Sequence, residues 1–150
     1  MRIKIGDVFA IPLGNGEFAF GQIVANTKPE CYVIYDYKSN DIPDLSLLIS
    51  QKIIFLTYTV DLFIKNGNWR VLGNINPPSN IIFPEYLIDT LNGYMVMDYT
   101  GKKLRFATDK EKTMLSTHKS VSPHLLETAV KARFGTGESH PYEETLLYKE

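Results

Sequence analysis

The stretch Ile5-Gly-Asp-Val-Phe-Ala-Ile-Pro-Leu-Gly-Asn-Gly-Glu-Phe-Ala-Phe-Gly-Gln-Ile-Val-Ala-Asn26 decides the fold of this 150-residue chain. It predicts two strands joined by a type I′ turn, because Asn15 and Gly16 tolerate the positive φ that both central residues of this turn require. Side chains alternate across a strand, so the hairpin is apolar on both faces and should be central to the fold. The expected pairs are Gly14 with Glu17, Leu13 with Phe18, Ile11 with Phe20 and Val8 with Ile23, which would place Ile11, Leu13, Phe18 and Phe20 on one face.

Pro12 and the runs after the hairpin indicate how the sheet continues. Proline has no N–H for a strand ladder, so the first strand should be an edge strand or carry a bulge at Pro12. Asn66-Gly67 predicts a second hairpin, between 60–64 and Trp69–Leu72. The other expected strands are 31–37, 52–60, 94–99 and 102–107.

One helix is strongly indicated, over 122–134. Ser122 is a favourable N-cap, Pro123 suits the first helical position, and Gly135 lies just past the end. Apolar residues at helical spacing form one stripe, made of Leu125, Leu126, Ala129, Val130 and Phe134. A shorter helix over 45–50 would be capped by Asp44.

These elements predict a single α+β domain over residues 1–150, with a flexible polar tail over about 136–150. A strongly bent, partly barrel-like antiparallel sheet would pack against one principal C-terminal helix (about 122–134). The Pro-rich segment 74–84 is too short and too apolar for a domain linker, so we expect an irregular loop there. At this length the chain can bury a core without metals or disulfides.

The opening stretch also resembles that of a known family. Gly6-Asp-Val-Phe-Ala-Ile-Pro-Leu13, a Gly-bearing turn and Phe18-Ala-Phe-Gly-Gln-Ile-Val24 are similar to the start of the bacterial immunity protein 26 family, whose members accompany polymorphic toxins. The resemblance extends to 53–60, to Trp69-Arg-Val-Leu-Gly73 and to the Pro-rich segment, and so covers about the first half of the chain. It brings no catalytic motif, and therefore implies a binding function.

Composition and charge exclude several classes of protein but name no partner. The chain has 16 Lys+Arg and 17 Asp+Glu residues and a net charge of −1, so the basic footprint of a nucleic-acid-binding protein is absent. Residues 101–135 carry 8 Lys/Arg against 3 Asp/Glu, which we interpret as a solvated face. A single cysteine, no apolar run of the ~20 residues that span a membrane, and no signal-peptide core together predict a cytoplasmic protein.

The patterns of catalysis, metal binding and cofactor binding are also missing. Cys31 has no basic neighbour in the sequence that would activate its thiol. The histidines at 118, 124 and 140 lack the spacing of a zinc site. Gly14-x-Gly16 is not followed by the helix and the Lys-Ser/Thr pair of a phosphate-binding loop. We therefore expect no enzymatic activity, no metal and no cofactor.

An acidic cluster with tyrosines beside it is the candidate toxin-binding surface. Its five residues are Tyr35, Asp36, Tyr37, Asp41 and Asp44. Three carboxylates flanked by aromatic rings would complement a basic toxin, such as a nuclease, and would steer its approach.

We therefore expect an immunity protein that binds a cognate toxin C-terminal domain directly and neutralises it without catalysis. The sequence predicts no membrane partner, disfavours nucleic acid and does not set the oligomeric state. The alternative is a small barrel-type module that binds nucleic acid or a peptide, with Tyr32, Tyr35 and Tyr37 placed to stack on bases. Salt dependence separates the two hypotheses, because nucleic-acid binding weakens steeply as salt rises.

Overall fold

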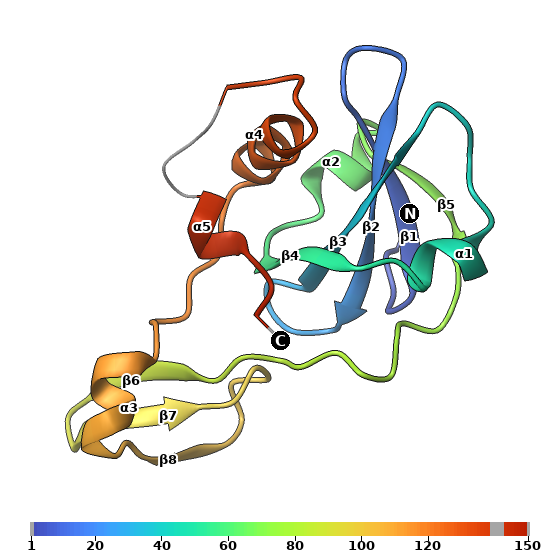
Figure 1. Cartoon of the computed structure of the whole chain (residues 1–150). Coiled ribbons are helices and arrows are strands. Elements are labelled where there is room, and N and C mark those ends of the chain that lie inside the picture. The colour runs from blue at the N-terminus through green and yellow to red at the C-terminus, as the bar shows by residue number, and fades with distance from the viewer. Residues whose placement is uncertain (1, 139–142, 150) are drawn as a thin grey trace. The chain divides into compact units, whose positions relative to one another are not determined.

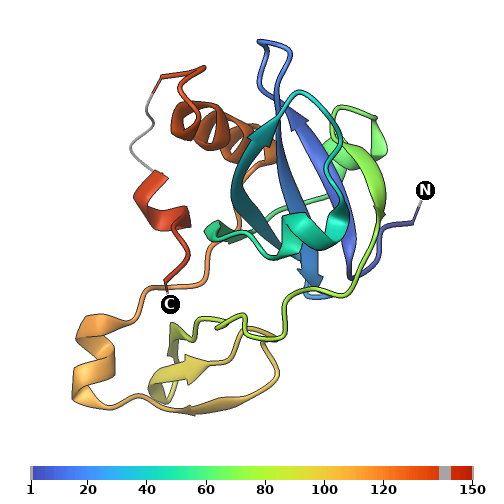
Figure 2. The same ribbon diagram turned by 45° about the vertical axis from the view of Figure 1, so that its right-hand side comes forward.

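The computed structural model describes residues 2–138 and 143–149 (Figure 1). The chain forms two compact units, one built mainly of Met1–Ser79 and Ser120–Tyr148 and the other mainly of Asn80–Lys119. Antiparallel sheets and helices occur together, which confirms the α+β class. The larger sheet is strongly bent but keeps two edge strands and does not close into a barrel (Figure 2).

Five antiparallel strands form the sheet of the larger unit, in the order β4-β3-β2-β1-β5. The strands are β1 (Asp7–Pro12), β2 (Phe18–Ala25), β3 (Cys31–Ser39), β4 (Ile53–Tyr58) and β5 (Arg70–Asn74). The helices of this unit are α1 (Leu45–Ile49), α2 (Leu62–Lys65), α4 (Pro123–Arg133) and α5 (Glu143–Leu146). The predicted central hairpin, the third strand, the short helix and the principal helix are thus confirmed.

The register of β1 against β2 differs by one residue from the prediction. Pro12 pairs with Phe18, and the Leu13 N–H donates to the Glu17 carbonyl over 3.0 Å. The loop therefore holds three residues, of which Gly14 and Gly16 have positive φ (88° and 89°) and Asn15 does not. The two glycines carry the left-handed backbone because they have no Cβ, so the predicted type I′ turn is wrong.

This one-residue shift moves each β2 side chain to the opposite face relative to the side chains of β1, because side chains alternate along a strand. The core face carries Phe9, Ile11, Leu13, Ala19 and Ile23, together with Tyr32 and Ile34 of β3. The opposite side, which we call the second face, carries Ala10, Pro12, Phe18, Phe20 and Gln22. Phe18 and Phe20 therefore do not share a face with Ile11 and Leu13, contrary to the prediction.

The core face is packed tightly at β2. A Cβ on Gly21 would lie 2.6 Å from the Phe9 Cζ and 2.8 Å from the Ile34 Cδ1. These separations are far inside van der Waals contact. Glycine at this position lets the aromatic ring of β1 cross over β2.

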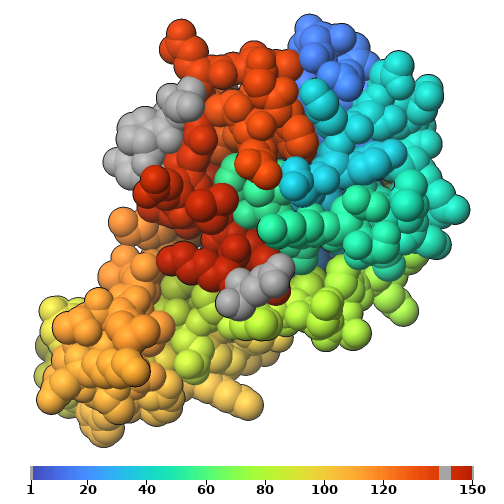
Figure 3. Space-filling model, viewed as in Figure 1, coloured from blue at the N-terminus to red at the C-terminus, as the bar shows by residue number. Residues whose placement is uncertain are grey.

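Helix α4 covers the core face. The Ser122 hydroxyl accepts a hydrogen bond from the Leu125 N–H over 3.0 Å, which confirms the predicted N-cap. Leu126, Ala129 and Val130 are each exposed by 1% or less. In Figures 1 and 3, α5 lies beside α4 on the surface of this unit.

Trp69 connects α4 to the sheet. Its side chain is fully buried, and its ring stacks on Phe9 with centroids 5.3 Å apart. Phe63 meets it edge-on at the same distance. The indole N–H donates to the Glu127 Oε1 of α4 over 3.3 Å. The only tryptophan of the chain is therefore a core residue.

The predicted hairpin around Asn66-Gly67 does not form. Residues Leu62–Lys65 are helical, and β5 pairs with β1 rather than with 60–64. The β1–β5 ladder ends at the pair Ala10–Arg70. Pro12 lies beyond this last pair. Most of β1 is therefore interior to the sheet, but at Pro12 one side of the strand is unpaired, so the missing N–H of proline costs no ladder hydrogen bond there.

The smaller unit is a three-stranded antiparallel sheet with one helix. Its strands are β6 (Tyr86–Thr90), β7 (Gly93–Met97) and β8 (Leu104–Phe106), and its helix is α3 (Asp109–Met114). The two predicted strands are confirmed, whereas α3 was not predicted. A capping box between Thr108 and Glu111 begins α3. This Thr-x-x-Glu pattern is a helix-start signal, and it was overlooked because the stretch is highly charged. Nowhere in the described chain does a helix have the length and apolarity to cross a membrane.

The predicted flexible tail falls partly outside the described residues, which exclude 139–142 and 150. The histidine at 140 also lies outside the described residues. Of the described part, the Tyr148 N–H donates to the Ile54 carbonyl over 2.7 Å. The segment after α5 is therefore joined to β4.

Candidate binding surface

Tyr35 is removed from the predicted binding surface by its burial. Its side chain is fully buried on the second face, and its hydroxyl donates to the Gln22 Oε1 over 2.5 Å. Burial raises the pKa of Tyr35. Tyr32 is also fully buried, on the core face. Neither ring can stack on a base or contact a protein partner in the folded state, which corrects both assignments.

Asp36 and Tyr37 lie on opposite faces of β3. The Arg133 Nη2 of α4 lies 3.3 Å from the Asp36 Oδ2, so this carboxylate belongs to the helix-covered side. Tyr37 packs against Phe20 on the second face, with ring centroids 6.0 Å apart. The structure therefore divides the predicted cluster between two sides of the sheet.

Asp41 and Asp44 remain together, on the exposed connection between β3 and α1. The Asp44 Oδ1 accepts from the Ser46 N–H over 3.0 Å, as expected for the N-cap of α1. The backbone N–H of Asp41 donates to the Ser39 hydroxyl over 3.0 Å, and the residue is exposed.

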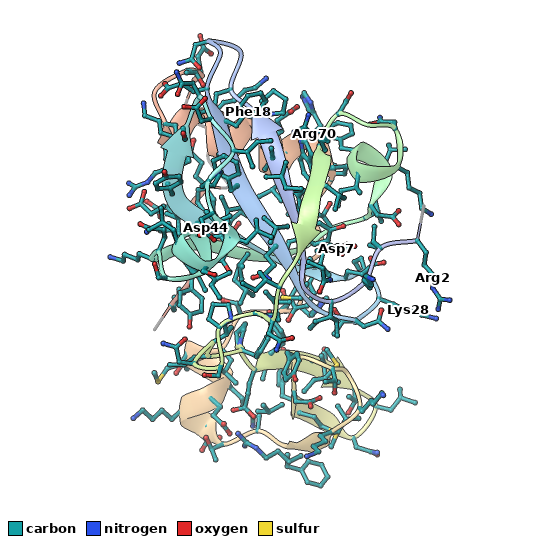
Figure 4. The ribbon with its side chains drawn as sticks, turned by 90° about the vertical axis from the view of Figure 1, so that its right-hand side faces the viewer. Arg2, Asp7, Phe18, Lys28, Asp44 and Arg70 are labelled. Atoms are coloured by element: carbon teal, nitrogen blue, oxygen red, sulfur yellow. The ribbon has the colours of Figure 1, made fainter. Side chains whose placement is uncertain are left out.

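Asp41 also borders a hollow of about 350 Å³ on the second face. We call it the sheet hollow. Its buried or half-buried lining is apolar and consists of Ala10, Pro12, Phe18, Phe20 and Leu72, whereas its exposed lining consists of Asn40, Asp41, Ile42, Gly67, Asn68 and Arg70. Figure 4 shows Phe18 and Arg70 near each other at one end of the five-stranded sheet.

Two charges of opposite sign lie at the mouth of the sheet hollow, those of Arg70 and Asp41. Among the described residues, no hydrogen bond or ion pair engages the Arg70 guanidinium or the Asp41 carboxylate. Both side chains are exposed. They are therefore available to groups of another molecule.

Several basic residues of 101–135, by contrast, are already paired. Arg105 lies between Glu111 and Glu85, and its hydrogen bond with Glu111 lowers the pKa of that carboxyl to about 2. Lys112 pairs with Asp109 at 3.5 Å. Arg133 pairs with Asp36 as well, so three of the eight basic residues of this segment make ion pairs of the kind usual at a solvated surface.

Cys31 and His118 are both packed against other side chains. Burial raises the pKa of the Cys31 thiol to about 12, against a smaller lowering by a hydrogen bond with Tyr58. The thiolate is the nucleophilic form, so Cys31 is unreactive at neutral pH. His118 packs edge-on against Tyr86 with centroids 4.8 Å apart, and burial lowers its pKa. Within the described ranges, no group of three His, Cys, Asp or Glu side chains could hold a metal ion.

The sequence did not reveal the sheet hollow, because the expected register placed Phe18 and Phe20 on the same face as Ile11 and Leu13. The signal that could have found it is the symmetric Gly14-Asn-Gly16. A loop of three residues with glycine at both ends puts Pro12 opposite Phe18, and then both aromatic rings fall on the second face.

Comparison with known proteins finds one family. A family model described as Immunity protein 26 matches residues 4–93. The match includes β1 to β6 and every residue that lines the sheet hollow. No curated protein and no solved structure matches the chain.

Proposed function

The chain belongs to the immunity protein 26 family, and we propose that it neutralises one cognate toxin domain by binding it directly. The observation that carries this function is the family match over 4–93, which implies a toxin as the partner. The buried thiol of Cys31, held protonated at neutral pH, is consistent with neutralisation by contact rather than by chemistry.

The proposed contact lies on the β3–α1 connection and the end of β3. Asp41 and Asp44 are exposed there, and Tyr37 is half-buried at the end of β3. Asp36 lies on the opposite face of β3 and pairs with Arg133. The two exposed carboxylates suit a basic toxin, such as a nuclease, because opposite surface potentials accelerate encounter. Tight neutralisation takes an interface on the order of 1,600 Å², so neighbouring surface of the larger unit would also be covered.

The site of action that we propose is the cytoplasm. The single cysteine is buried and unpaired in the structure. The fold therefore needs no oxidising compartment.

Co-purification with the toxin tests this function. The tagged chain is co-expressed with the toxin C-terminal domain encoded beside its gene, and the complex is washed at moderate and at high salt. We expect one-to-one capture at both salt concentrations and protection of cells that express the toxin. A wild-type chain that neither captures nor neutralises this toxin would contradict the proposal.

Charge reversal then locates the contact. Asp41→Lys should weaken binding about tenfold, mainly through a slower association rate that high salt makes less visible. Asp89→Lys is the matched control, because Asp89 is an equally exposed carboxylate in the smaller unit. Equal affinities of the two variants for the toxin would show that the contact does not include Asp41 on the β3–α1 connection.

A further inference from the structure

The sheet hollow has the features of a pocket that receives one side chain of a protein partner. Binding energy at protein interfaces concentrates where a large side chain fills a desolvated pocket surrounded by polar residues. We propose that the sheet hollow takes a large apolar side chain of the toxin domain, flanked on that domain by an acidic and a basic residue. This inference rests on the proposed function and names the part of the surface that provides the anchor.

The size of the hollow leaves room for a large side chain. Its volume of about 350 Å³ lies at the lower limit of ligand pockets, which run from about 300 to 1,000 Å³. The buried lining is apolar, whereas the polar groups are all exposed at the mouth. A site for a small polar metabolite would place polar groups in its interior. The observed division suits an apolar anchor with charged neighbours.

The floor of the hollow is already formed in the free protein. Ala10 pairs with Phe20 and Pro12 with Phe18 in the β1–β2 ladder. Phe20 is only 1% exposed and is supported by the Tyr37 ring. Regular strand pairing thus holds the pocket open without a rearrangement, which removes one cost of association.

The charges at the mouth set the chemistry of the flanking residues. Arg70 belongs to β5 and Asp41 follows β3, and β1 and β2 lie between these strands in the sheet. The two charges therefore approach the hollow from different sides. Arg70 would bind a carboxylate through parallel hydrogen bonds, and Asp41 would bind a lysine or arginine. A partner with the reverse order of charges would meet like charge on both sides.

The test measures affinity for the toxin domain encoded beside the gene, by titration calorimetry with the full chain. Three variants change exposed lining residues without touching the core. They are Ile42→Ser, Arg70→Glu and Asn68→Trp, which respectively remove apolar lining, reverse a charge and place a large ring in part of the hollow.

Each variant has a matched control away from the hollow. Ile5→Ser changes an isoleucine that is 48% exposed, compared with 60% for Ile42. Arg2→Glu makes the same charge change at a residue that Figure 4 shows at the opposite end of the larger unit. Asn26→Trp adds an exposed ring just after β2, at the far end of the strand from Phe18.

We expect wild type to bind, Asn68→Trp to lose at least ~30-fold in affinity, and Ile42→Ser and Arg70→Glu to lose about tenfold each. The three controls should stay within about twofold. A carboxylate on the toxin that is changed to arginine should restore binding to Arg70→Glu, and should weaken binding to the wild type and to the controls, which all keep Arg70. Unchanged Trp69 fluorescence and urea midpoints would show that the variants are folded.

Wild-type binding with all three hollow variants at wild-type affinity would overturn the anchor and leave the proposed function intact. Absence of wild-type binding would overturn both. If light scattering shows a homodimer that Asn68→Trp dissociates while toxin binding is unchanged, the occupant is a second copy of this chain, and the toxin anchor is wrong.

Discussion

Cys31 gives the folded protein a defined response to alkaline pH. Burial between β2 and β4 raises the pKa of its thiol to about 12 from an ordinary value of 9.0. As pH rises, the unfolded chain therefore loses this proton first, and stability that is fully present below about pH 9 is lost towards pH 12. We expect the urea midpoint to fall between pH 8 and pH 10.5, and to fall less in Cys31→Ala.

Tyr32 and Tyr35 act in the same direction, because burial raises the pKa of both. The comparison of wild type with Cys31→Ala isolates the thiol from these phenols. If the urea midpoint of the alanine variant falls with pH as steeply as that of wild type, the pKa of the thiol is the same in the folded and the unfolded protein, and the prediction is wrong.

Gln22 stabilises the sheet through three side-chain hydrogen bonds. Its side-chain N–H groups donate to the carbonyls of Ile75, at 2.8 Å, and Gly6, at 3.2 Å, and its Oε1 accepts from Tyr35. Gln22→Leu removes the partner of the Tyr35 hydroxyl and of the Ile75 carbonyl, whereas the Gly6 carbonyl keeps its hydrogen bond from the Ile75 N–H. We therefore expect a loss of about 3 kcal/mol of unfolding free energy. Tyr35→Phe leaves one acceptor unpaired and should cost about 1 kcal/mol. Urea titration checks the order, and equal costs would contradict it.

At the scale of elements, α4 contributes to stability through one side of its apolar stripe. Leu126 is fully buried, whereas Leu125 is half-buried. Leu126→Ala should cost about 3 kcal/mol because it leaves a cavity under the helix, and Leu125→Ala should cost about 1 kcal/mol or less. The two variants remove the same atoms from the same helix, so equal midpoints would mean that α4 does not seal the core.

Local chemistry made several elements predictable and left others hidden. Ser122, Pro123 and Asp44 act within one helical turn, and the structure confirms both caps. The β1–β2 register depends on which residues of Gly14-Asn15-Gly16 form the turn. Asn15-Gly16 alone would give a two-residue loop, whereas Gly14 has positive φ and makes the loop one residue longer. The pairing of β5 with β1 joins residues about 60 positions apart, which no turn signal encodes.

The candidate surface was predictable only where residues lie in loops. Asp41 and Asp44 are exposed as expected. Tyr35 was misplaced because a strand covered on both faces carries no alternation of apolar and polar residues. Arg70 and Phe18 were missed because their proximity depends on the sheet order β2-β1-β5.

For the whole molecule, the division into two units predicts that the larger unit folds without the smaller one. Every residue of the main core cluster lies outside 80–119. Replacing 80–119 by a flexible Gly-Ser linker of about 15 residues should leave Trp69 buried, with blue-shifted fluorescence and a cooperative urea transition. Red-shifted emission in the absence of urea would show that the larger unit requires the smaller one. The full-length chain is the control.

The position of α4 in the chain has a consequence for the time course of synthesis. The five strands of the larger sheet are complete at Asn74, but the helix that covers their core face begins only at Pro123. At a translation rate of roughly 5–20 residues per second, the growing chain waits some 2–10 s with that face unsealed. Nascent chains would be clients of chaperones during this interval. Protection of a cell would therefore lag the start of translation and follow the completion of whole chains.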